Sequence, residues 1–454
     1  MRARSLTLLL LTACLGLLSG CGGYASSSEA FRKSLGRGAP DQALGGVNEA
    51  LGVDRPEQLP SEKEADTPLL LLERGTILQA MGRYADSARD FQTADGMLDV
   101  LDLSGDAIGS LGKYLFSDDA TLYKAPPHEK LLLNTLNMIN YLALGDASGA
   151  KVEARRLVIS SKYLADIGEG DARRMLALSS YLAGFAFEAA GDADAAMRHY
   201  ADAHAAGGVP TLDDAIRALN ARRGSTDPRV ADVLAAGAAP AEAADSADLL
   251  VVVQTGMAPF REPIRVPIAN AILLTHRDGR TRLSAAEQRR AQVLATKGLL
   301  KWVNYPRLRR VAPRRALAAV QVDGRALPGG PALDVESRVL DEFERAVPSL
   351  VAASITRLLA RAVAGEVSQA ATRKGSGNGL AGLLVGLAVE GAMVAADTPD
   401  TRGWVTLPAT VSVARLRVPP GAHTVTVVLG GETREVQVDL PPGGWKLLNF
   451  SAAR

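Results

Sequence analysis

The feature that most constrains the fold of this chain is a change of residue pattern near residue 248. Between Pro68 and about Gly207, apolar and small residues recur at helical spacing. An Ala-rich stretch over 233–248 follows, without a clear apolar face, and after it the chain turns to β-branched runs and strict alternation. We therefore expect an α+β protein with helices first and strands later, and a domain boundary in the Ala-rich stretch.

Length and charge narrow the class further. The 454 residues are 47% hydrophobic, which exceeds what one core usually holds, so about two or three domains are expected. With 51 basic and 50 acidic side chains, no overall field attracts nucleic acid, and we predict no nucleic-acid partner. Aromatic residues are only 4%, which favours closely packed helices over an aromatic-lined small-molecule pocket.

The N-terminus has the features of a secretory signal. Basic Arg2 and Arg4 precede an apolar run over 6–18, which is shorter than the ~20 residues that span a bilayer, and Leu18-Ser19-Gly20-Cys21 follows. This segment resembles bacterial lipoprotein signals, which implies cleavage after residue 20 and acylation of Cys21. In that resemblance, Gly22 in place of Asp implies sorting to the outer membrane, with the protein facing the periplasm.

Two alternatives to this signal are an ordinary secreted protein and a lipobox that ends at Cys14. The second leaves only about six apolar residues, against the usual 7 to 15. If Cys14 leaves with the signal and Cys21 is acylated, the mature chain has no free thiol. Disulfides, thiolate metal sites and cysteine nucleophiles are then excluded.

Histidine placement predicts no metal site. His128-Glu129 begins like a zinc-protease helix, but Leu132 occupies the place of the second imidazole. Among the five histidines only His199 and His204 are near one another, and their spacing points them to different sides of a helix. We expect no catalytic residue, no metal and no cofactor, and classify the chain as a non-enzyme.

Residues 21–64 are rich in Ser, Gly, Pro and charge and are predicted to be a tether with some helix. Residues 65–240 contain segments with a shared layout. In the clearest, Gly75 lies on a first helix, Gly82 in a turn and Phe91 on a second helix, and the same offsets recur from Gly184 to Tyr200. A weaker third unit has its turn at residue 145, with Met138 in place of the first glycine.

These segments resemble tetratricopeptide repeats with irregular spacing. The resemblance implies stacked helical hairpins whose concave side stays open to bind a peptide or protein. Asn137, Asn140 and Tyr141 are the predicted partner contacts, because their polar tips stand on a helix otherwise rich in Leu and Met. The alternative is that they form hydrogen bonds between helices.

The second half is divided into a mixed α/β region over 248–400 and an antiparallel β-rich, sandwich-like module over 401–454. The expected buried strands of the mixed region are 249–255, 271–277 and 316–322, and residues 337–371 are expected to form one or two helices interrupted near Pro348. The four expected strands of the terminal module are 405–418, 423–429, 433–440 and 445–450.

Two further segments have open interpretations. The apolar stretch Leu380–Ala396 carries Gly382 and Gly386 at the spacing of close helix contacts, but Glu390 in its interior favours internal packing over insertion into a membrane. A basic cluster is the other, and it either contacts an anionic surface or forms a solvated loop. Its members are Arg307, Arg309, Arg310, Arg314 and Arg315.

In the order of its features, the chain resembles a family of uncharacterised bacterial outer-membrane lipoproteins with tetratricopeptide-like repeats. The segments that carry this resemblance are 123–156, 354–362 and 396–425. It implies a role in envelope assembly. The predicted function is therefore a periplasmic scaffold anchored by Cys21 that binds an unknown envelope protein. The alternatives are a structural subunit of a secretion or surface-organelle complex and, less favoured, a cell-wall or glycan-acting enzyme.

Overall fold

The computed structural model describes residues 23–98, 123, 125–165, 171–241, 243–276, 283–298, 300–311, 319–373, 399–429 and 431–453. Within them the protein is a mixed α+β fold, with helices mainly in the N-terminal part and strands mainly in the C-terminal part. This confirms the coarse fold class that the change of pattern predicts. Cys21, Arg314, Arg315 and Leu380–Ala396 lie outside the described residues.

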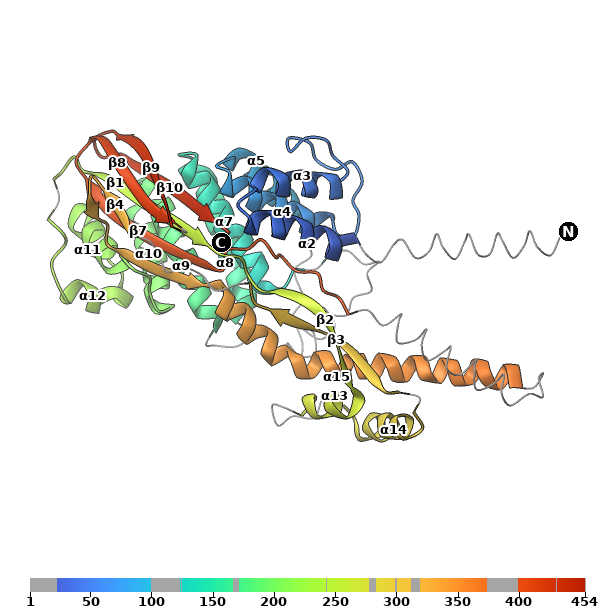
Figure 1. The fold of residues 1–454 in the computed structure, drawn as a ribbon. Helices are drawn as coiled ribbons and strands as arrows, with labels where there is room; N and C mark the ends of the chain where they lie inside the picture. The colour runs from blue at the N-terminus through green and yellow to red at the C-terminus, as the bar shows by residue number, and fades with distance from the viewer. Residues whose placement is uncertain are drawn as a thin grey trace.

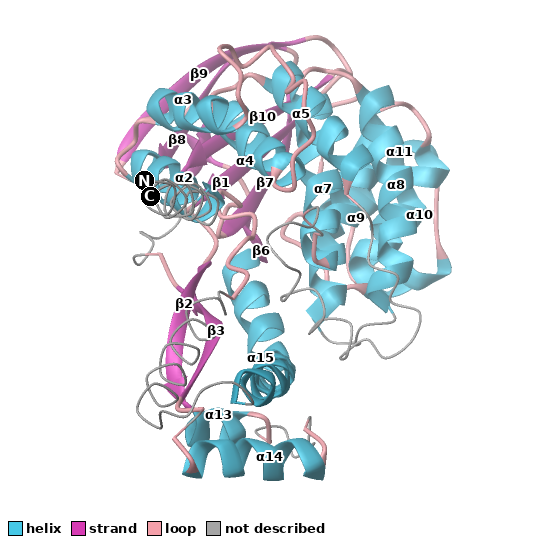
Figure 2. Ribbon diagram, turned by 90° about the vertical axis from the view of Figure 1, so that its right-hand side faces the viewer, coloured by secondary structure: helices cyan, strands magenta, loops and turns pink. Residues whose placement is uncertain are grey.

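The helices of the N-terminal part pack in chain order, each against the next, along an arc (Figure 2). Helix α4 is buried along nearly its whole length and is rich in Leu, although Glu73, Arg74 and Gln79 are buried with it. The helices are α2 (Gly23–Gly36), α3 (Pro40–Ala50), α4 (Thr67–Ala80), α5 (Tyr84–Met97), α7 (Pro127–Ala143), α8 (Ala147–Ala165), α9 (Asp171–Ala189), α10 (Ala193–Ala205), α11 (Leu212–Arg223), the 3₁₀ turn η1 (Pro228–Val230) and α12 (Ala231–Ala235).

Small residues allow close contact inside two of the helix pairs. A Cβ on Gly75 of α4 would lie 2.5 Å from Phe91 of α5, and one on Gly184 of α9 would lie 2.3 Å from Tyr200 of α10. The turn of the first pair has Gly82 at φ 76°, in the left-handed region that favours glycine. Each small residue therefore makes room for the aromatic ring that the shared sequence layout places opposite it.

The expected tether is wrong for the described part of residues 21–64. Helices α2 and α3 bury Phe31, Leu35, Leu44 and Val47 in the same core as the other helices. Apolar side chains spaced three or four residues apart give each of these short helices one buried face. The segment is part of the folded body.

Two four-stranded sheets form the C-terminal part (Figure 1). The first has the order β10-β1-β7-β6, with β1 parallel to β10 and antiparallel to β7; the second has the order β5-β4-β8-β9. The strands are β1 (Ala247–Thr255), β4 (Val320–Val322), β5 (Arg325–Ala326), β6 (Gly329–Asp334), β7 (Thr410–Val418), β8 (Gly421–Leu429), β9 (Glu432–Leu440) and β10 (Trp445–Ala452).

The first sheet lies between the helices and the second sheet. Along β1, Leu250 and Val252 join the core shared with the helices, whereas Leu249, Val251 and Val253 join the core between the two sheets. A strand buried on both faces needs apolar residues at every position, which explains its continuous apolar run. Each fully buried Leu or Val contributes about 1.5–3 kcal/mol of hydrophobic stabilisation.

Residues 401–454 do not form a sheet of their own. β7 and β10 pair with β1, and β8 pairs with β4. Each sheet therefore contains strands from both sides of the expected boundary at residue 400. Residues 405–409, expected as the start of a strand, precede β7. Alternation along a strand predicts which face is buried but not which strand lies beside it.

An arm extends from this body (Figure 1). It consists of the strand pair β2 (Phe260–Pro267) and β3 (Trp302–Arg309), the helices α13 (Ile268–Leu274) and α14 (Ala285–Thr296), and the long helix α15 (Val335–Arg373). Its core is separate from the cores of the body and contains Leu294, Val303, Leu350 and Ile355. The arm is therefore held together mainly by its own contacts.

Two expectations for this region are wrong. The expected strand 271–277 is helical over 271–274 and a turn over 275–276, since α13 begins directly after Pro267 and runs to Leu274. The interruption expected near Pro348 does not break the helix: α15 continues through this residue, and Figure 1 shows a bend in its first half. Proline removes one helical hydrogen bond, and packing of Leu350, Val351 and Ile355 in the arm core holds the helix together beyond it.

None of the helices in the described ranges is long and apolar enough to cross a membrane.

Candidate functional site

The inner face of the helical arc is not open. The first sheet covers it, with β10 against α4 and α7 and β6 against α9. A stretch without regular structure, the 399–407 segment, fills the remaining space beside α2, α4 and α7. The open concave surface expected from the helical pattern is therefore occupied by the chain itself.

Two buried carboxylates hold the backbone of the 399–407 segment. Glu73 of α4 accepts hydrogen bonds from the N–H groups of Val405 at 2.8 Å and Thr406 at 3.0 Å. Glu129 of α7 accepts one from the N–H of Trp404 at 3.0 Å. Tyr24 of α2 donates to Glu73 at 2.7 Å. Buried donors and acceptors are costly to leave unpaired, so these hydrogen bonds fix the segment in register.

Side chains of the segment are anchored as well. Trp404 is only 2% exposed, donates its indole N–H to Thr76 at 2.9 Å and packs edge-on against Phe91, with ring centroids 5.6 Å apart. Arg402 pairs with Asp400 in its own segment and with Asp66 before α4, at 2.8 and 3.0 Å. The segment is thus a built part of the core.

Burial changes the protonation of this region. It raises the pKa of Glu73 to about 7, although hydrogen bonds from Tyr24 and from residues 405 and 406 act in the opposite direction. Burial alone would lower the pKa of His128 in α7, but the facing carboxylate of Glu342 in α15, at 2.7 Å, raises it above its ordinary value. The His128–Glu342 pair also links the arm to the body.

The predicted partner contacts Asn137 and Asn140 are fully buried. Asn140 accepts from Gln79 of α4 at 2.7 Å and donates to Ser87 of α5 at 2.8 Å and to Asn137 at 3.2 Å. The hydroxyl of half-buried Tyr141 accepts from Gln92 of α5. The prediction is wrong for the two asparagines: Asn140 forms the hydrogen bonds between helices that the sequence left as the alternative, and Asn137 accepts from Asn140 within α7.

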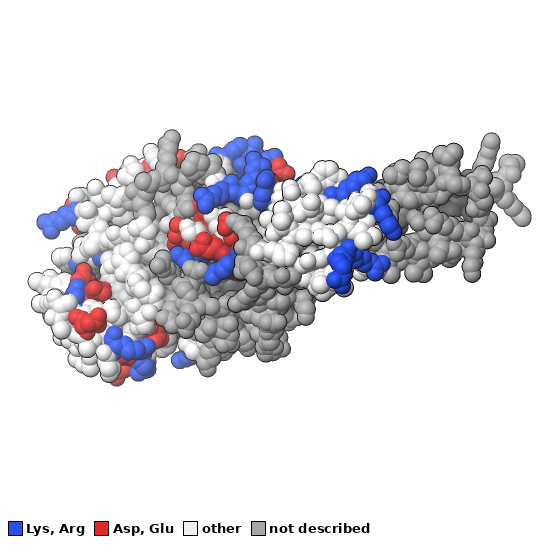
Figure 3. All heavy atoms as spheres, turned by 90° about the horizontal axis from the view of Figure 1, so that it is seen from below, with Lys and Arg blue, Asp and Glu red and all other residues white. Residues whose placement is uncertain are grey.

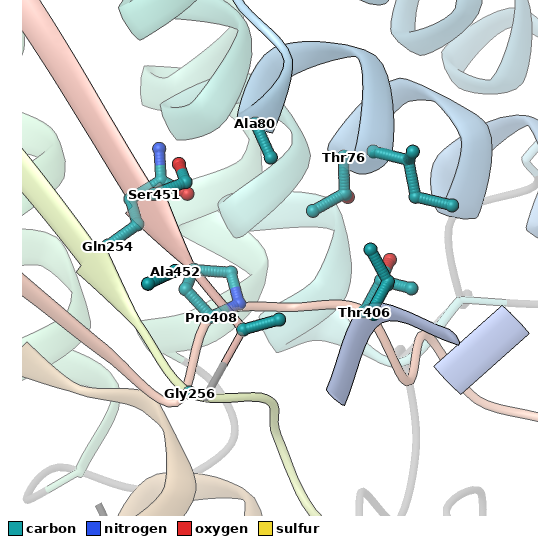
Figure 4. Close-up of a pocket in the computed structure, with 11 residues that line it drawn as sticks. Thr76, Ala80, Gln254, Gly256, Thr406, Pro408, Ser451 and Ala452 are labelled. Atoms are coloured by element: carbon teal, nitrogen blue, oxygen red, sulfur yellow. The ribbon is translucent and has the colours of Figure 1, made fainter. Parts of the chain in front are cut away.

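The same polar network reaches the first sheet. Gln254 of β1 donates to Gln79 at 2.8 Å and to Asn449 of β10 at 2.9 Å. Figure 4 shows the small cavity beside it, where Gln254 and Ser451 lie across from Thr76 and Thr406. Its volume of about 30 Å³ has room for about one water molecule. No substrate-sized ligand fits there.

A larger cleft lies open at the other end of the helical array, between α9, α11 and the turns that precede β1 and β10. Its volume is about 560 Å³. Phe185 and Trp445 form one wall, with ring centroids 5.9 Å apart and ring planes perpendicular. Glu188, Arg222 and Arg223 supply charge. This combination of aromatic and arginine side chains is typical of contact points in protein interfaces.

A buried ion network supports the cleft from below. Arg415 of β7 donates to Asp248 of β1 at 2.9 and 2.5 Å, to Glu188 of α9 at 2.8 Å and to the hydroxyl of Tyr200 at 2.8 Å. Its guanidinium also lies 4.8 Å from the centre of the Phe185 ring. The network ties both layers together directly under the cleft and holds its walls in place.

The described members of the predicted basic cluster are exposed but paired. Arg307 and Arg309 of β3 both contact Glu262 of β2, and Arg310 lies 3.6 Å from Glu336 of α15. Within the β2–β3 strand pair, these arginines lie at the end that is nearest the body. The three described arginines of the predicted cluster therefore lie together on the arm. They are separate from Asn137, Asn140 and Tyr141, which lie among the helices of the body.

One feature of the sequence indicates the buried charged groups that the helix and strand patterns did not predict. Glu73 and Arg74 interrupt the apolar run of α4, and Asp248 and Arg415 interrupt apolar strands. A charge in a run that must be buried needs an opposite charge or several donors beside it. Such positions identify buried networks, although the sequence alone does not show which charges meet.

Within the described residues, no group of three or more His, Cys, Asp or Glu side chains could hold a metal ion. No family model matches the chain, and no curated protein and no solved structure shows significant similarity to it.

Proposed function

We propose that this chain is a lipoprotein of the bacterial outer membrane that faces the periplasm and acts as a scaffold for another envelope protein. The anchor would be an acyl group on Cys21, supported by the basic start, the short apolar run and the small residues before the cysteine. A single acyl chain binds a membrane weakly, so a stable anchor needs the several chains of a bacterial lipoprotein.

The helical part supports a scaffold role. Its helices follow one another in chain order, and two pairs share the same small-residue and aromatic contact, which we interpret as an irregular array of tetratricopeptide-like hairpins. Since the chain's own sheet and the 399–407 segment occupy the inner face, the partner binds elsewhere. The open cleft is the observation that carries the proposal.

The cleft suits a partner segment that combines an apolar side chain with an acidic group. Trp445 offers apolar surface and packs on the buried ring of Phe185, and three arginines line the cleft against two carboxylates. Because the Arg415 network fixes the walls, little conformational entropy is lost when a partner binds.

Photo-cross-linking in living cells tests the scaffold role. A photoreactive amino acid replaces Arg223 or Ala244, both exposed at the cleft, and Arg325 on the second sheet serves as the matched exposed control. We expect a discrete heavier product from both cleft positions and none from the control. Equal products from all three positions, or none from the cleft, would contradict the proposal.

Labelling with a radioactive fatty acid tests the anchor separately. The chain should incorporate label and sediment with outer membranes, and Cys21→Ser should lose both properties. If Cys21→Ser keeps the label, acylation at this residue is wrong, whatever the cross-linking result.

A further inference from the structure

The end of the arm farthest from the body combines charge and apolar surface in an unusual way. In the described residues 260–276, 283–298 and 300–311 of the arm there are nine Lys and Arg against two Glu, although the whole chain is almost neutral. Arg289, Arg290, Lys297 and Lys301 lie at the end farthest from the body, whereas Arg261, Arg307, Arg309 and Arg310 lie at the end nearest it. Figure 3 shows clusters of Lys and Arg toward the end of the arm, separated by uncharged surface. The arm therefore has a strong local positive field.

Large apolar side chains are exposed at the same end. Leu273 of α13 is 71% exposed, Val293 of α14 is 50% exposed, and Trp302 at the start of β3 is 42% exposed. Trp302 pairs with Pro267 at the end of the strand pair that is far from the body. At this end β2 stops and α13 begins. A soluble surface does not need three such groups on one small tip.

Helix α14 presents one of them between two cations. Arg289, Val293 and Lys297 are spaced four residues apart and are all exposed, so they lie along one face of the helix. Ala291 and Leu294 point the other way, into the arm core. The outward face is thus a cation–apolar–cation stripe on a helix that is otherwise amphipathic.

The tip is also rigid. Ser284 caps α14 in a capping box with Glu287, and Glu287 in turn accepts from Thr356 of α15 at 2.8 Å. The carbonyl of Lys301 accepts from the N–H of Ile268 at 3.0 Å, which fixes α13 against β3. The stripe of α14 and the ring of Trp302 are therefore held in place before any contact forms.

From this combination we propose that the arm tip, formed by α13, α14 and the first residues of β3, binds the surface of a lipid bilayer with anionic headgroups. Lys and Arg contact the headgroup phosphates, and Trp302, Leu273 and Val293 insert at the boundary of headgroups and acyl chains. A purely polar polyanion such as a nucleic acid gains nothing from Leu and Val. This contact is separate from the proposed acyl anchor on Cys21.

Vesicle binding of the chain that starts at Gly22 tests the proposal. No acyl group can hold this chain on a membrane, and all described helices and strands lie within it. We expect it to sediment with vesicles of phosphatidylglycerol and phosphatidylcholine but not with pure phosphatidylcholine, and binding should weaken as salt rises. Equal binding to both vesicle types, or none to either, overturns the proposal.

Charge variants locate the contact. Arg289→Glu with Lys297→Glu should weaken binding to the anionic vesicles at least about tenfold, from the contribution of each cation near a charged membrane. The matched control is Arg55→Glu with Arg325→Glu, which makes the same change of net charge at exposed positions on the body. Equal loss in both double variants would mean that only net charge matters and would contradict a specific tip.

Tryptophan quenching tests the depth of the contact. Brominated lipids should quench the fluorescence of the vesicle-bound chain, and Trp302→Phe should remove this quenching, because Trp404 is buried in the body. Trp445→Phe is the control and should keep it. If the bound chain is not quenched, or is quenched equally in Trp302→Phe, the tip does not insert.

Discussion

The inner face of the helical arc and the tip of the arm differ in how their polar and aromatic groups are used. On the inner face, Trp404 is buried and the carboxylates of Glu73 and Glu129 accept hydrogen bonds from the chain's own backbone. On the arm, Trp302 is exposed and stands near cations that face solvent. The same residue types thus build a closed core in one region and a contact surface in the other.

A repeated helical pattern does not by itself make an open binding surface. Stacked helices leave an apolar inner face that must be covered, and residues far along the chain can cover it as well as a partner can. Here the cover includes β10 and the 399–407 segment, which lie more than 300 residues after α4.

The largest expected effect contrasts two arginines. Arg415→Met removes the two-bond partner of buried Asp248 and one of the two arginines that contact Glu188, and should lower the free energy of unfolding by about 3–5 kcal/mol. Arg307→Met removes an exposed ion pair on the arm and should change it by less than about 1 kcal/mol. Urea unfolding of both variants measures the difference, and equal losses would break the contrast between the regions.

The two tryptophans Trp404 and Trp302 should differ in their contributions to stability. Trp404→Ala should cost about 3–5 kcal/mol, because it leaves a cavity against Phe91 and removes the hydrogen bond to Thr76. Trp302→Ala should cost less than about 1 kcal/mol, because the side chain is already partly in water. The measurement is again urea unfolding of each variant. A loss for Trp302→Ala as large as that for Trp404→Ala would show that the arm tip is part of a core.

The smallest expected effect is a change in the free energy of unfolding with pH. The pKa of Glu73 in the folded protein is about 7, above its ordinary value of 4.5, so the folded state binds the extra proton between these values. The contribution to stability is therefore fully present below about pH 4.5 and is lost as the pH rises through 7, by up to about 3 kcal/mol.

Unfolding of the wild type and Glu73→Gln at pH 5 and pH 8 measures this contribution. Other titrating groups, including His128 and Glu342, are common to both proteins and cancel in the comparison. We expect the wild type to lose more stability than Glu73→Gln on going to pH 8. Parallel pH curves for the two proteins would contradict the raised pKa.

The sequence predicts local structure better than it predicts the site. The change of period near residue 248, the apolar run of β1 and the contacts of Gly75 with Phe91 and of Gly184 with Tyr200 all follow from short-range pattern. The tether, the strand at 271–277 and the separate terminal module do not hold, because packing between distant residues decides them. Asn137 and Asn140 show the same limit: a polar residue on an apolar helix predicts a partner but not whether that partner lies in the same chain.

Hydrogen–deuterium exchange of the unmodified chain shows whether the 399–407 segment covers the inner face of the helices. If the chain itself fills the inner face of the helices, the amides of Trp404, Val405 and Thr406, bonded to Glu129 and Glu73, should exchange at least about a hundredfold more slowly than those of an exposed loop. Exchange of these three amides at the rate of an unstructured peptide would mean that the segment does not occupy the face, and the account would be wrong.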